Sequence, residues 1–386
     1  LKTRMAFPTS LPHFLQGPEP YPAESVIEHY ANKARGASIV TCMGINNFSH
    51  GKQLPMNLDF GHFPDFNLYD TNSQNYLLQL ADSIHFYDSI ACMGIFVGPP
   101  SAYPLMVPKG QQGKADPFSQ TKSLNAPPPA EFDLMKIPAH EDPTYYTEEQ
   151  FNLIADSYAE QAGILKMLDF DMISIHMCYR ANLPAKMFSP ITNHRTDKFG
   201  GSLENRCRFI DEIIAAIRAK LGSYPISVRI CGDEMTDEPG FLTLEDGLEI
   251  GRHLEAQGID CINISNGSSW NGNANCEPFS YTPGWKKHVA KAFKEALSIP
   301  VIATNTIKDP DFAESLLEEG VCDFVALGRS QFADPEFMNK AKAGHPEKIR
   351  KCIGCMYCRE RLLGNAMPVE CSLNPRLGTE YRYRWQ

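Results

Sequence analysis

The sequence has no long hydrophobic run. No stretch approaches the roughly 20 apolar residues that a membrane-spanning helix requires, which argues against a membrane protein. Basic charge is also scarce, because 36 Lys and Arg stand against 46 Asp and Glu. The resulting net charge of −10 argues against nucleic acid as the main partner. The start, Leu1-Lys2-Thr3-Arg4, has neither an initiator methionine nor a signal peptide and looks trimmed.

What is present is the composition of a folded globular protein. The 386 residues are 43% hydrophobic, 21% charged and 10% aromatic, which excludes a disordered chain, a collagen-like repeat and a coiled coil. A core of this size needs no disulfides, so the 12 cysteines indicate a reducing, cytoplasmic compartment. Eight of them are scattered singly, and we expect most of these to be buried as small hydrophobic residues: Cys42, Cys92, Cys178, Cys207, Cys231, Cys261, Cys276 and Cys322.

Short apolar runs alternate with longer helix-period stretches along the chain. The short runs have the length and the Val, Ile and aromatic content of strands buried on both faces: 4–9, 37–43, 90–97, 171–177, 225–232, 260–267, 300–306 and 322–328. The longer stretches have helical periodicity: 25–36, 74–89, 148–168, 203–222, 244–258, 284–298 and 311–320. Eight strands, each followed by a helical segment, predict an α/β fold of the (β/α)8 TIM-barrel type.

Two further patterns bear on this fold. An open doubly wound sheet usually carries a glycine fingerprint in its first turn, whereas residues 7–12 contain no glycine. Ser202 and Thr243 stand where helix N-caps belong. Glycines fall at or just after four helices, where a left-handed cap residue fits: Gly36, Gly222, Gly258 and Gly320.

One connection is too long for an ordinary barrel loop. Residues 98–147, after the third strand, form a proline-rich excursion on the rim where barrel active sites lie. A lid or specificity loop is one interpretation, and a wrap over the barrel wall without a role in chemistry is the other. Both remain open at this point.

Four cysteines gather near the C-terminal end. Cys352, Cys355 and Cys358 form a CxxCxxC run, and Cys371 follows after twelve residues. Zinc ribbons usually have two separated CxxC pairs, whereas three ligands in one tight turn with a remote fourth favour a 4Fe-4S cluster. Structural zinc and free thiols are the alternatives. A one-electron cluster beside a barrel implies a redox cofactor such as a flavin in the barrel.

The loops after the seventh and eighth strands are where barrels bind phosphate. Gly328 lets the backbone approach a phosphate, and Arg329 offers a planar fork of donors; a surface salt bridge is the alternative for Arg329. Arg229 lies inside the buried strand 225–232. An arginine there must be paired, with Asp233 or Glu234, or must face an anionic ligand such as a reduced flavin.

A longer motif then identifies a relative. Phe188-Ser189-Pro190, followed by the run from Arg195 to Arg206, resembles the signature of the old yellow enzyme family of flavin reductases. The chain is most similar to the iron–sulfur branch with 2,4-dienoyl-CoA reductase, 2-enoate reductases and trimethylamine dehydrogenase. The resemblance covers nearly the whole chain, and the cysteine spacing is nearest to the amine dehydrogenase.

The resemblance implies a domain organisation and two bound groups. It implies an FMN-binding barrel over residues 1–345 and a cluster-binding segment over 346–386. The implied cluster ligands are Cys352, Cys355, Cys358 and Cys371. The implied flavin contacts are Pro8, Thr9, Arg229, Asn305, Thr306, Gly328 and Arg329.

Departures from the family pattern qualify these expectations. Asn305 and Thr306 replace the usual glycine pair of the seventh strand, and the glutamine expected in 92–96 is absent. Larger members continue into an FAD- and NAD(P)H-binding half. We therefore expect NAD(P)H as the electron source, acting directly, through a separate donor protein, or through a missing C-terminal half. A homo-oligomer remains open.

The fourth strand ends in a modified catalytic pair. The family's usual polar pair falls on Met177 and Arg180, which leaves His176, Tyr179 and Arg180 as candidates. Arg180 would bind the carbonyl or carboxylate of a small-molecule substrate, and Tyr179 would donate a proton. The alternatives are a salt bridge for Arg180, packing against flavin for Tyr179, and a core position for His176.

Three functions compete on this evidence. An ene-reductase acting on an α,β-unsaturated carbonyl or carboxylate is the first. An amine dehydrogenase is the second: Trp270 resembles its aromatic cation wall, but the expected carboxylate falls on Asn273 and the cysteine that holds its FMN is absent from 7–13. An electron-transfer subunit without substrate chemistry of its own is the third.

Overall fold

A computed structural model describes most of the chain. The described residues are 1–10, 21–46, 66–96, 143–180, 182–268, 272–304, 306–364 and 367–383. Most of the long excursion, together with Asn305 and Trp270, therefore lies outside the described residues. Among the helices of the described part, none is both long and apolar enough to span a membrane.

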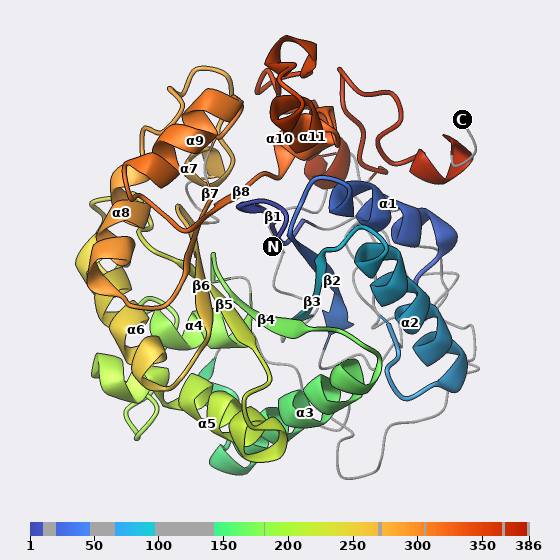
Figure 1. Cartoon of the computed structure of the whole chain (residues 1–386). Helices are drawn as coiled ribbons and strands as arrows, with labels where there is room; N and C mark the ends of the chain where they lie inside the picture. Colours follow the sequence, from blue (N-terminus) through green and yellow to red (C-terminus); the bar gives the residue numbers. More distant parts are fainter. Residues whose placement is uncertain are drawn as a thin grey trace.

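Eight parallel strands close into a barrel, as the sequence predicts (Figure 1). Each strand pairs with the next, and β8 pairs with β1 to complete the ring. The strands are β1 Met5–Phe7, β2 Ile39–Asn46, β3 Ile90–Phe96, β4 Met172–Met177, β5 Ile226–Cys231, β6 Cys261–Ser265, β7 Val301–Thr304 and β8 Phe324–Ala326. Residues of β4, β5 and β6 are buried along their whole length, since helices cover the outside and side chains fill the inside.

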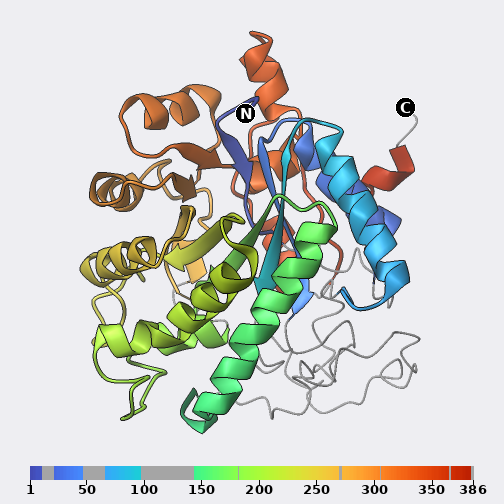
Figure 2. The same ribbon diagram turned by 60° about the horizontal axis from the view of Figure 1, so that its bottom comes forward.

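Helices surround this barrel. The longer ones are α1 Glu24–Ala34, α2 Thr71–His85, α3 Glu148–Met167, α5 Leu203–Leu221, α6 Leu244–Ala256, α8 Lys287–Ala296 and α9 Pro310–Glu318. Shorter helices are α4 Leu183–Phe188, α7 Gly272–Asn275, α10 Arg329–Ala333, α11 Phe337–Lys342 and α12 Tyr357–Arg359. Figure 2 shows α3 running along the outer wall, where it packs beside α5.

The helix ends confirm most of the predicted caps. Ser202 accepts a hydrogen bond from the Asn205 amide, and Thr243 forms a reciprocal capping box with Asp246. Of the four predicted glycines, those with positive φ are Gly222, Gly258 and Gly320. The prediction is wrong for Gly36, whose backbone is not left-handed. A side chain there would lie 3.3 Å from the Pro335 carbonyl oxygen, so close packing explains this glycine.

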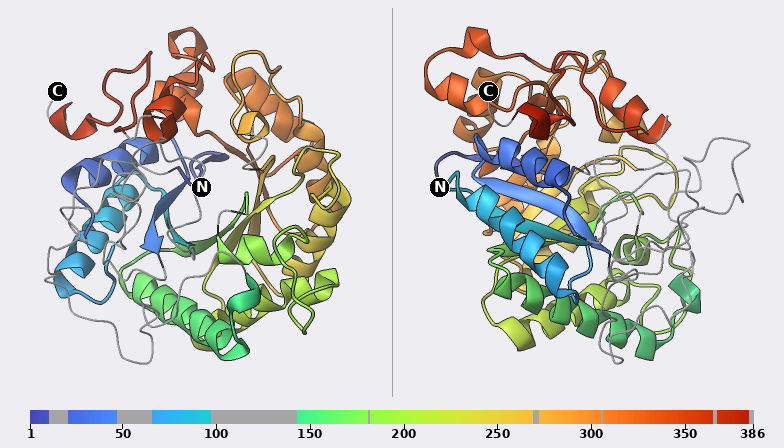
Figure 3. Two further views of the ribbon diagram at one scale, coloured as in Figure 1. Left: turned by 180° about the vertical axis from the view of Figure 1, so that it is seen from behind. Right: turned by 90° about the vertical axis from the view of Figure 1, so that its right-hand side faces the viewer.

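The C-terminal segment lies beside the first helix of the barrel. After α11, the chain passes through the cysteine-rich loop and ends in the 3-10 helix η9 Glu380–Tyr383. Figures 1 and 3 show this red segment next to the blue α1, and η9 contacts α1 directly. Residues from the two ends of the sequence therefore form one continuous wall.

The cysteines are all free thiols. Seven of the eight scattered cysteines are buried, as predicted. The exception is Cys276, which is partly exposed and lines a cavity.

Candidate functional site

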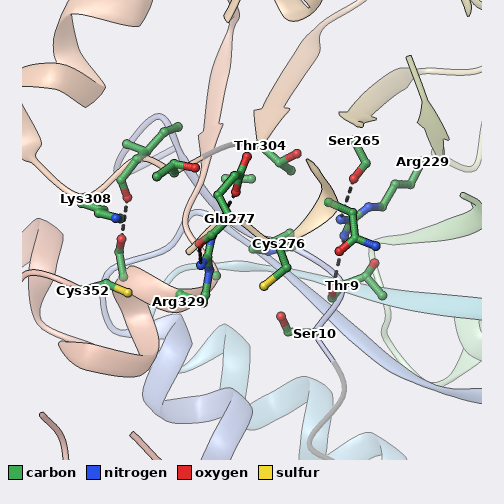
Figure 4. Close-up of a pocket in the computed structure, with 17 residues that line it drawn as sticks. Thr9, Ser10, Arg229, Ser265, Cys276, Glu277, Thr304, Lys308, Arg329 and Cys352 are labelled. Atoms are coloured by element: carbon green, nitrogen blue, oxygen red, sulfur yellow. Dashed lines mark hydrogen bonds and ion pairs between the residues drawn. The ribbon is translucent and has the colours of Figure 1, made fainter. Parts of the chain in front are cut away.

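A cavity of about 160 Å³ that opens to solvent lies at the C-terminal ends of the strands (Figure 4). The structure brings six of the predicted flavin contacts together on its wall: Pro8, Thr9, Arg229, Thr306, Gly328 and Arg329. These residues follow β1, belong to β5, or follow β7 and β8, so the barrel topology gathers them from distant parts of the chain.

Arg229 is buried, with 8% of its surface exposed. Its Nη1 donates to the Thr9 carbonyl oxygen at 3.2 Å, and its Nη2 donates to the Tyr179 and Ser265 hydroxyls at 3.3 and 3.4 Å. Its Nε has no hydrogen-bond partner in the described part of the chain. The alternative that Arg229 pairs with Asp233 or Glu234 is wrong, because Glu234 pairs with Arg180 instead.

Gly328 and Arg329 form the corner of the cavity after β8. A side chain at Gly328 would enter a space bordered by Pro8 and Ser10, 3.7 Å from an atom of each. The alternative that Arg329 forms a surface salt bridge is wrong, because Arg329 is bound to a buried carboxylate. Its Nη2 lies 3.0 Å from Oε2 of Glu277, and its Nη1 donates to the Glu277 carbonyl oxygen.

Sequence reasoning missed this carboxylate. Glu277 is 2% exposed and binds a second buried cation, with 2.7 Å between its Oε1 and Lys286 Nζ. Trp285 Nε1 donates to the same oxygen at 3.3 Å. Arg329 and Lys286 come from different segments of the chain. No local sequence motif could therefore predict that both bind Glu277.

The residues after β4 hold an unusual backbone conformation. Tyr179 and Arg180 have φ of 64° and 53°, in the left-handed region that non-glycine residues rarely occupy. Such strain is concentrated at functional sites, where surrounding contacts maintain it. Asn182 provides one of these contacts, because its Nδ2 donates to the His176 carbonyl oxygen at 2.6 Å and its Oδ1 caps α4.

His176 is buried and Tyr179 is partly buried, and both are uncharged at neutral pH. Burial and the nearby Arg229 lower the pKa of His176 to about 3. Burial raises the pKa of Tyr179 to about 12, so its hydroxyl keeps its proton. That hydroxyl is hydrogen-bonded to the Ser265 hydroxyl as well as to Arg229. Tyr179 is therefore connected to the cavity by hydrogen bonds to two residues that line it, Arg229 and Ser265.

Arg180 is buried, and only part of its guanidinium has hydrogen-bond partners among the described residues. Its Nη1 is 3.4 Å from Glu234 Oε1, and its guanidinium carbon is 4.5 Å from the centre of the Phe241 ring. Only 7% of the residue is exposed, yet Nη2 has no hydrogen-bond partner within the described residues. Glu234 is itself held by the Leu242 amide, which donates to its Oε2 at 2.8 Å. One donor of Arg180 is thus buried without a partner among the described residues.

The structure also brings the four C-terminal cysteines together. Cys352, Cys355, Cys358 and Cys371 line a second, smaller cavity. Two residues line both cavities, Arg329 and Cys352. In the described part of the chain, no three of these thiols lie within 4.8 Å of one another. The four-cysteine site and the barrel cavity therefore share a wall.

Comparisons with known proteins show which family and which relatives this chain resembles. Residues 1–348 match the model of the NADH:flavin oxidoreductase / NADH oxidase family. A metal reductase of Desulforamulus reducens is 39% identical over 62% of this chain and 36% of its own length. An NADH oxidase of Thermoanaerobacter brockii is 31% identical over 94% of this chain and 52% of its own. The chain thus spans about half or less of these curated relatives.

Two further relatives differ in the reactions that their names state. A cinnamate reductase of Clostridium sporogenes is 30% identical over 61% of this chain and 38% of its own length. A dimethylamine dehydrogenase of a Hyphomicrobium species is 26% identical over 82% of this chain and 42% of its own.

A solved structure shows the same fold. A 2-naphthoyl-CoA reductase superimposes with a TM-score of 0.79 at 24% identity, covering 98% of this chain and 56% of that one. The family model covers most of the chain, and the closed barrel agrees with it. The chain therefore belongs to the NADH:flavin oxidoreductase / NADH oxidase family.

Proposed function

We propose that this protein is an FMN- and 4Fe-4S-dependent ene-reductase. It would reduce the C=C bond of an α,β-unsaturated carbonyl or carboxylate compound with electrons from NAD(P)H, received directly, from a donor protein or from a second half of the chain. The observation that carries the proposal is Arg229, a buried guanidinium on the cavity wall with no ion-pair partner among the described carboxylates. A buried charge of this kind fits an anionic ligand.

The cavity residues fit a flavin nucleotide. The Arg229 guanidinium would donate to the polar edge of the ring, and its contacts with Thr9 and Ser265 fix the direction of this group. Gly328 leaves space where a side chain would project between Pro8 and Ser10, which suits the close approach of a phosphate. Residues 1–345 would hold this group, and 346–386 would hold the cluster.

The four thiols fit an iron–sulfur cluster better than zinc. Sulfurs around a tetrahedral zinc ion, at Zn–S distances of about 2.3 Å, lie about 3.8 Å from one another. No three of these described thiols are within 4.8 Å of one another, so the described side chains are not arranged as such a site. A cube of iron and sulfide holds its ligands further apart and satisfies four cysteines at its corners.

Arg180 and Tyr179, which follow β4, would bind the substrate and donate a proton to it. FMN, when bound, supplies the hydride for one alkene carbon. Arg180 would polarise the conjugated carbonyl or bind the carboxylate through its guanidinium. Tyr179 holds a proton at its hydroxyl and could deliver it to the other alkene carbon. His176, as a neutral imidazole, would keep Asn182 and the strained turn in place.

An amine dehydrogenase remains the second candidate because of the dimethylamine dehydrogenase relative. Electrostatics argue against it. Two buried guanidiniums, Arg180 and Arg229, lie at this end of the barrel, and of the two only Arg180 has an ion-pair partner among the described residues, Glu234. An ammonium substrate would be repelled by that surplus of positive charge, whereas a carbonyl or carboxylate would be attracted.

Arg180→Ala tests the proposed substrate role. We expect turnover on enoates or enones to be lost while FMN and iron content stay unchanged, because Arg180 touches neither proposed cofactor site. The assay is anaerobic NAD(P)H oxidation with a panel of such substrates. Arg218→Ala, which removes an outer-surface ion pair with Asp260, is the matched control. Unaltered kinetics of Arg180→Ala on an accepted substrate would falsify the anchor role.

The spectrum of the flavin separates the candidate functions. Bleaching by NAD(P)H and recovery with an enoate support the ene-reductase. Bleaching by tertiary or secondary amines, but not by NAD(P)H, favours the amine dehydrogenase. A flavin that responds to neither favours an electron-transfer subunit.

A further inference from the structure

A buried ion cluster joins the two ends of the chain. Lys33 and His29 lie one turn apart on α1, and both are fully buried. Between them they bind one carboxylate oxygen of Glu380, at 3.1 Å from Lys33 Nζ and 3.2 Å from His29 Nδ1. Glu380 opens η9 and its side chain is 6% exposed. Lys33 and Glu380 are 347 residues apart in sequence, and His29 and Glu380 are 351 residues apart, so the contact is purely tertiary.

The segment that carries Glu380 also carries the fourth cysteine. Cys371 is followed by Asn374, whose Nδ2 donates to the Phe332 carbonyl oxygen of α10 at 2.8 Å. Leu377 is 1% exposed and packs in the main core. Glu380 then completes the attachment to α1. The fourth cysteine is thus fixed by contacts with the barrel, while the other three come from residues 352–358, a loop that leads into the short helix α12.

Phe332 connects this attachment to the four-cysteine cavity. Its ring lies 6.1 Å from the His29 ring and 6.0 Å from Lys33 Nζ, and it lines the cavity of the four cysteines. A displaced Glu380 would leave Lys33 and His29 facing an apolar neighbour without their counter-charge. Because an unpaired buried charge is strongly unfavourable, the ion pair between Lys33 and Glu380 stabilises the segment in its docked position against α1.

We propose that His29, Lys33 and Glu380 form a C-terminal latch, a set of positioning residues that holds Cys371 in place before and after a cluster binds. The part of this inference that concerns iron rests on the proposed cluster. The part that concerns the docking of residues 371–383 does not. The two parts can be measured separately.

Glu380→Gln tests the latch. The change keeps size and hydrogen-bonding capacity but removes the charge. Hydrogen exchange of the 367–383 peptide in the iron-free protein should become at least tenfold faster, while the peptide with Cys352 to Cys358 changes less than twofold. In the iron-loaded protein, release of iron to EDTA should also accelerate at least tenfold. Glu319→Gln is the control, because it removes the same charge from the exposed pair with Lys287.

A double variant distinguishes the latch from general destabilisation. Adding Lys33→Met to Glu380→Gln should slow the exchange of 367–383 relative to Glu380→Gln alone, because it removes the buried charge that the first substitution leaves unpaired. The latch is overturned if Glu380→Gln exchanges like Glu319→Gln, if all peptides accelerate equally, or if the two changes multiply. A wild-type protein that binds no iron overturns the proposed cluster alone, because the exchange measurement still tests the docking.

Discussion

Two arginines at the end of the barrel differ in how their charge is balanced. Among the described residues, Arg180 has a carboxylate partner in Glu234 and one unpaired donor, whereas the partners of Arg229 are carbonyl and hydroxyl groups. The sequence predicted that Arg229 is buried in a strand and that Arg180 follows one, because the apolar runs around them are clear. It left the partners open, since Glu234 and Ser265 meet these arginines only through the closed barrel.

Arg229→Met should lower the FMN content of the purified protein at least tenfold. The substitution retains bulk but removes the charge that the cavity offers to an anionic ligand. Arg229→Lys should lose less, because it keeps the charge and loses only the fork of donors. The measurement is flavin fluorescence after denaturation, per mole of protein. Equal FMN content in Arg229→Met and wild type would place the flavin elsewhere.

His176 should make the protein sensitive to acid. Its pKa is about 3 when folded and about 6.5 when unfolded. Between these values the unfolded chain binds the additional proton, so the free energy of unfolding falls as pH drops below 6.5. At pH 5 the loss is about 2 kcal/mol relative to pH 7.5. His176→Gln should remove this part of the pH dependence, measured by urea unfolding at both pH values.

His253 provides a control of opposite sign. Its hydrogen bond with Asp211 raises the pKa of His253, so its stabilising effect is present at low pH and fades as the pH rises through the folded pKa. His253→Gln should therefore lose more stability at pH 5 than at pH 7.5. If His176→Gln keeps the full acid sensitivity of the wild type, burial of this imidazole is not its cause.

At the scale of elements, the sequence predicted every strand of the barrel and the seven longer outer helices. Their ends were less accurate, because local side-chain contacts decide them. Helix α2 begins at Thr71, three residues before the predicted start, since Asp70 accepts a hydrogen bond from the Ser73 amide. The short helices α4, α7, α10, α11 and α12 were not predicted, because so few residues show no helical periodicity.

Gly247 should be indispensable for the packing of α6. A side chain there would lie 2.2 Å from the Gly232 carbonyl oxygen, just after β5. Gly247→Ala should cost roughly 1–3 kcal/mol of unfolding free energy by forcing the helix outward. Gly163→Ala, inside α3, is the matched control: its nearest atom is the flexible Lys220 Cε at 3.4 Å, so it should gain up to about 1 kcal/mol of helix propensity. Urea unfolding measures both, and equal effects would contradict this packing.

At the scale of the molecule, one barrel carries two adjoining sites. The cavity with Arg229 and the four-cysteine cavity share Arg329 and Cys352. The sequence predicted both sites separately, from residues that follow strands and from cysteine spacing. It could not predict their common wall, because Glu277, which binds both Arg329 and Lys286, comes from a segment without a recognisable motif.

The most direct test of this account is the cofactor content of the protein purified without oxygen. The absorption spectrum, extracted flavin, iron and acid-labile sulfide are measured on one sample. We expect a yellow-brown protein with one FMN and four irons per chain, and with flavin absorbance that NAD(P)H bleaches. A colourless protein that contains only zinc would contradict the account.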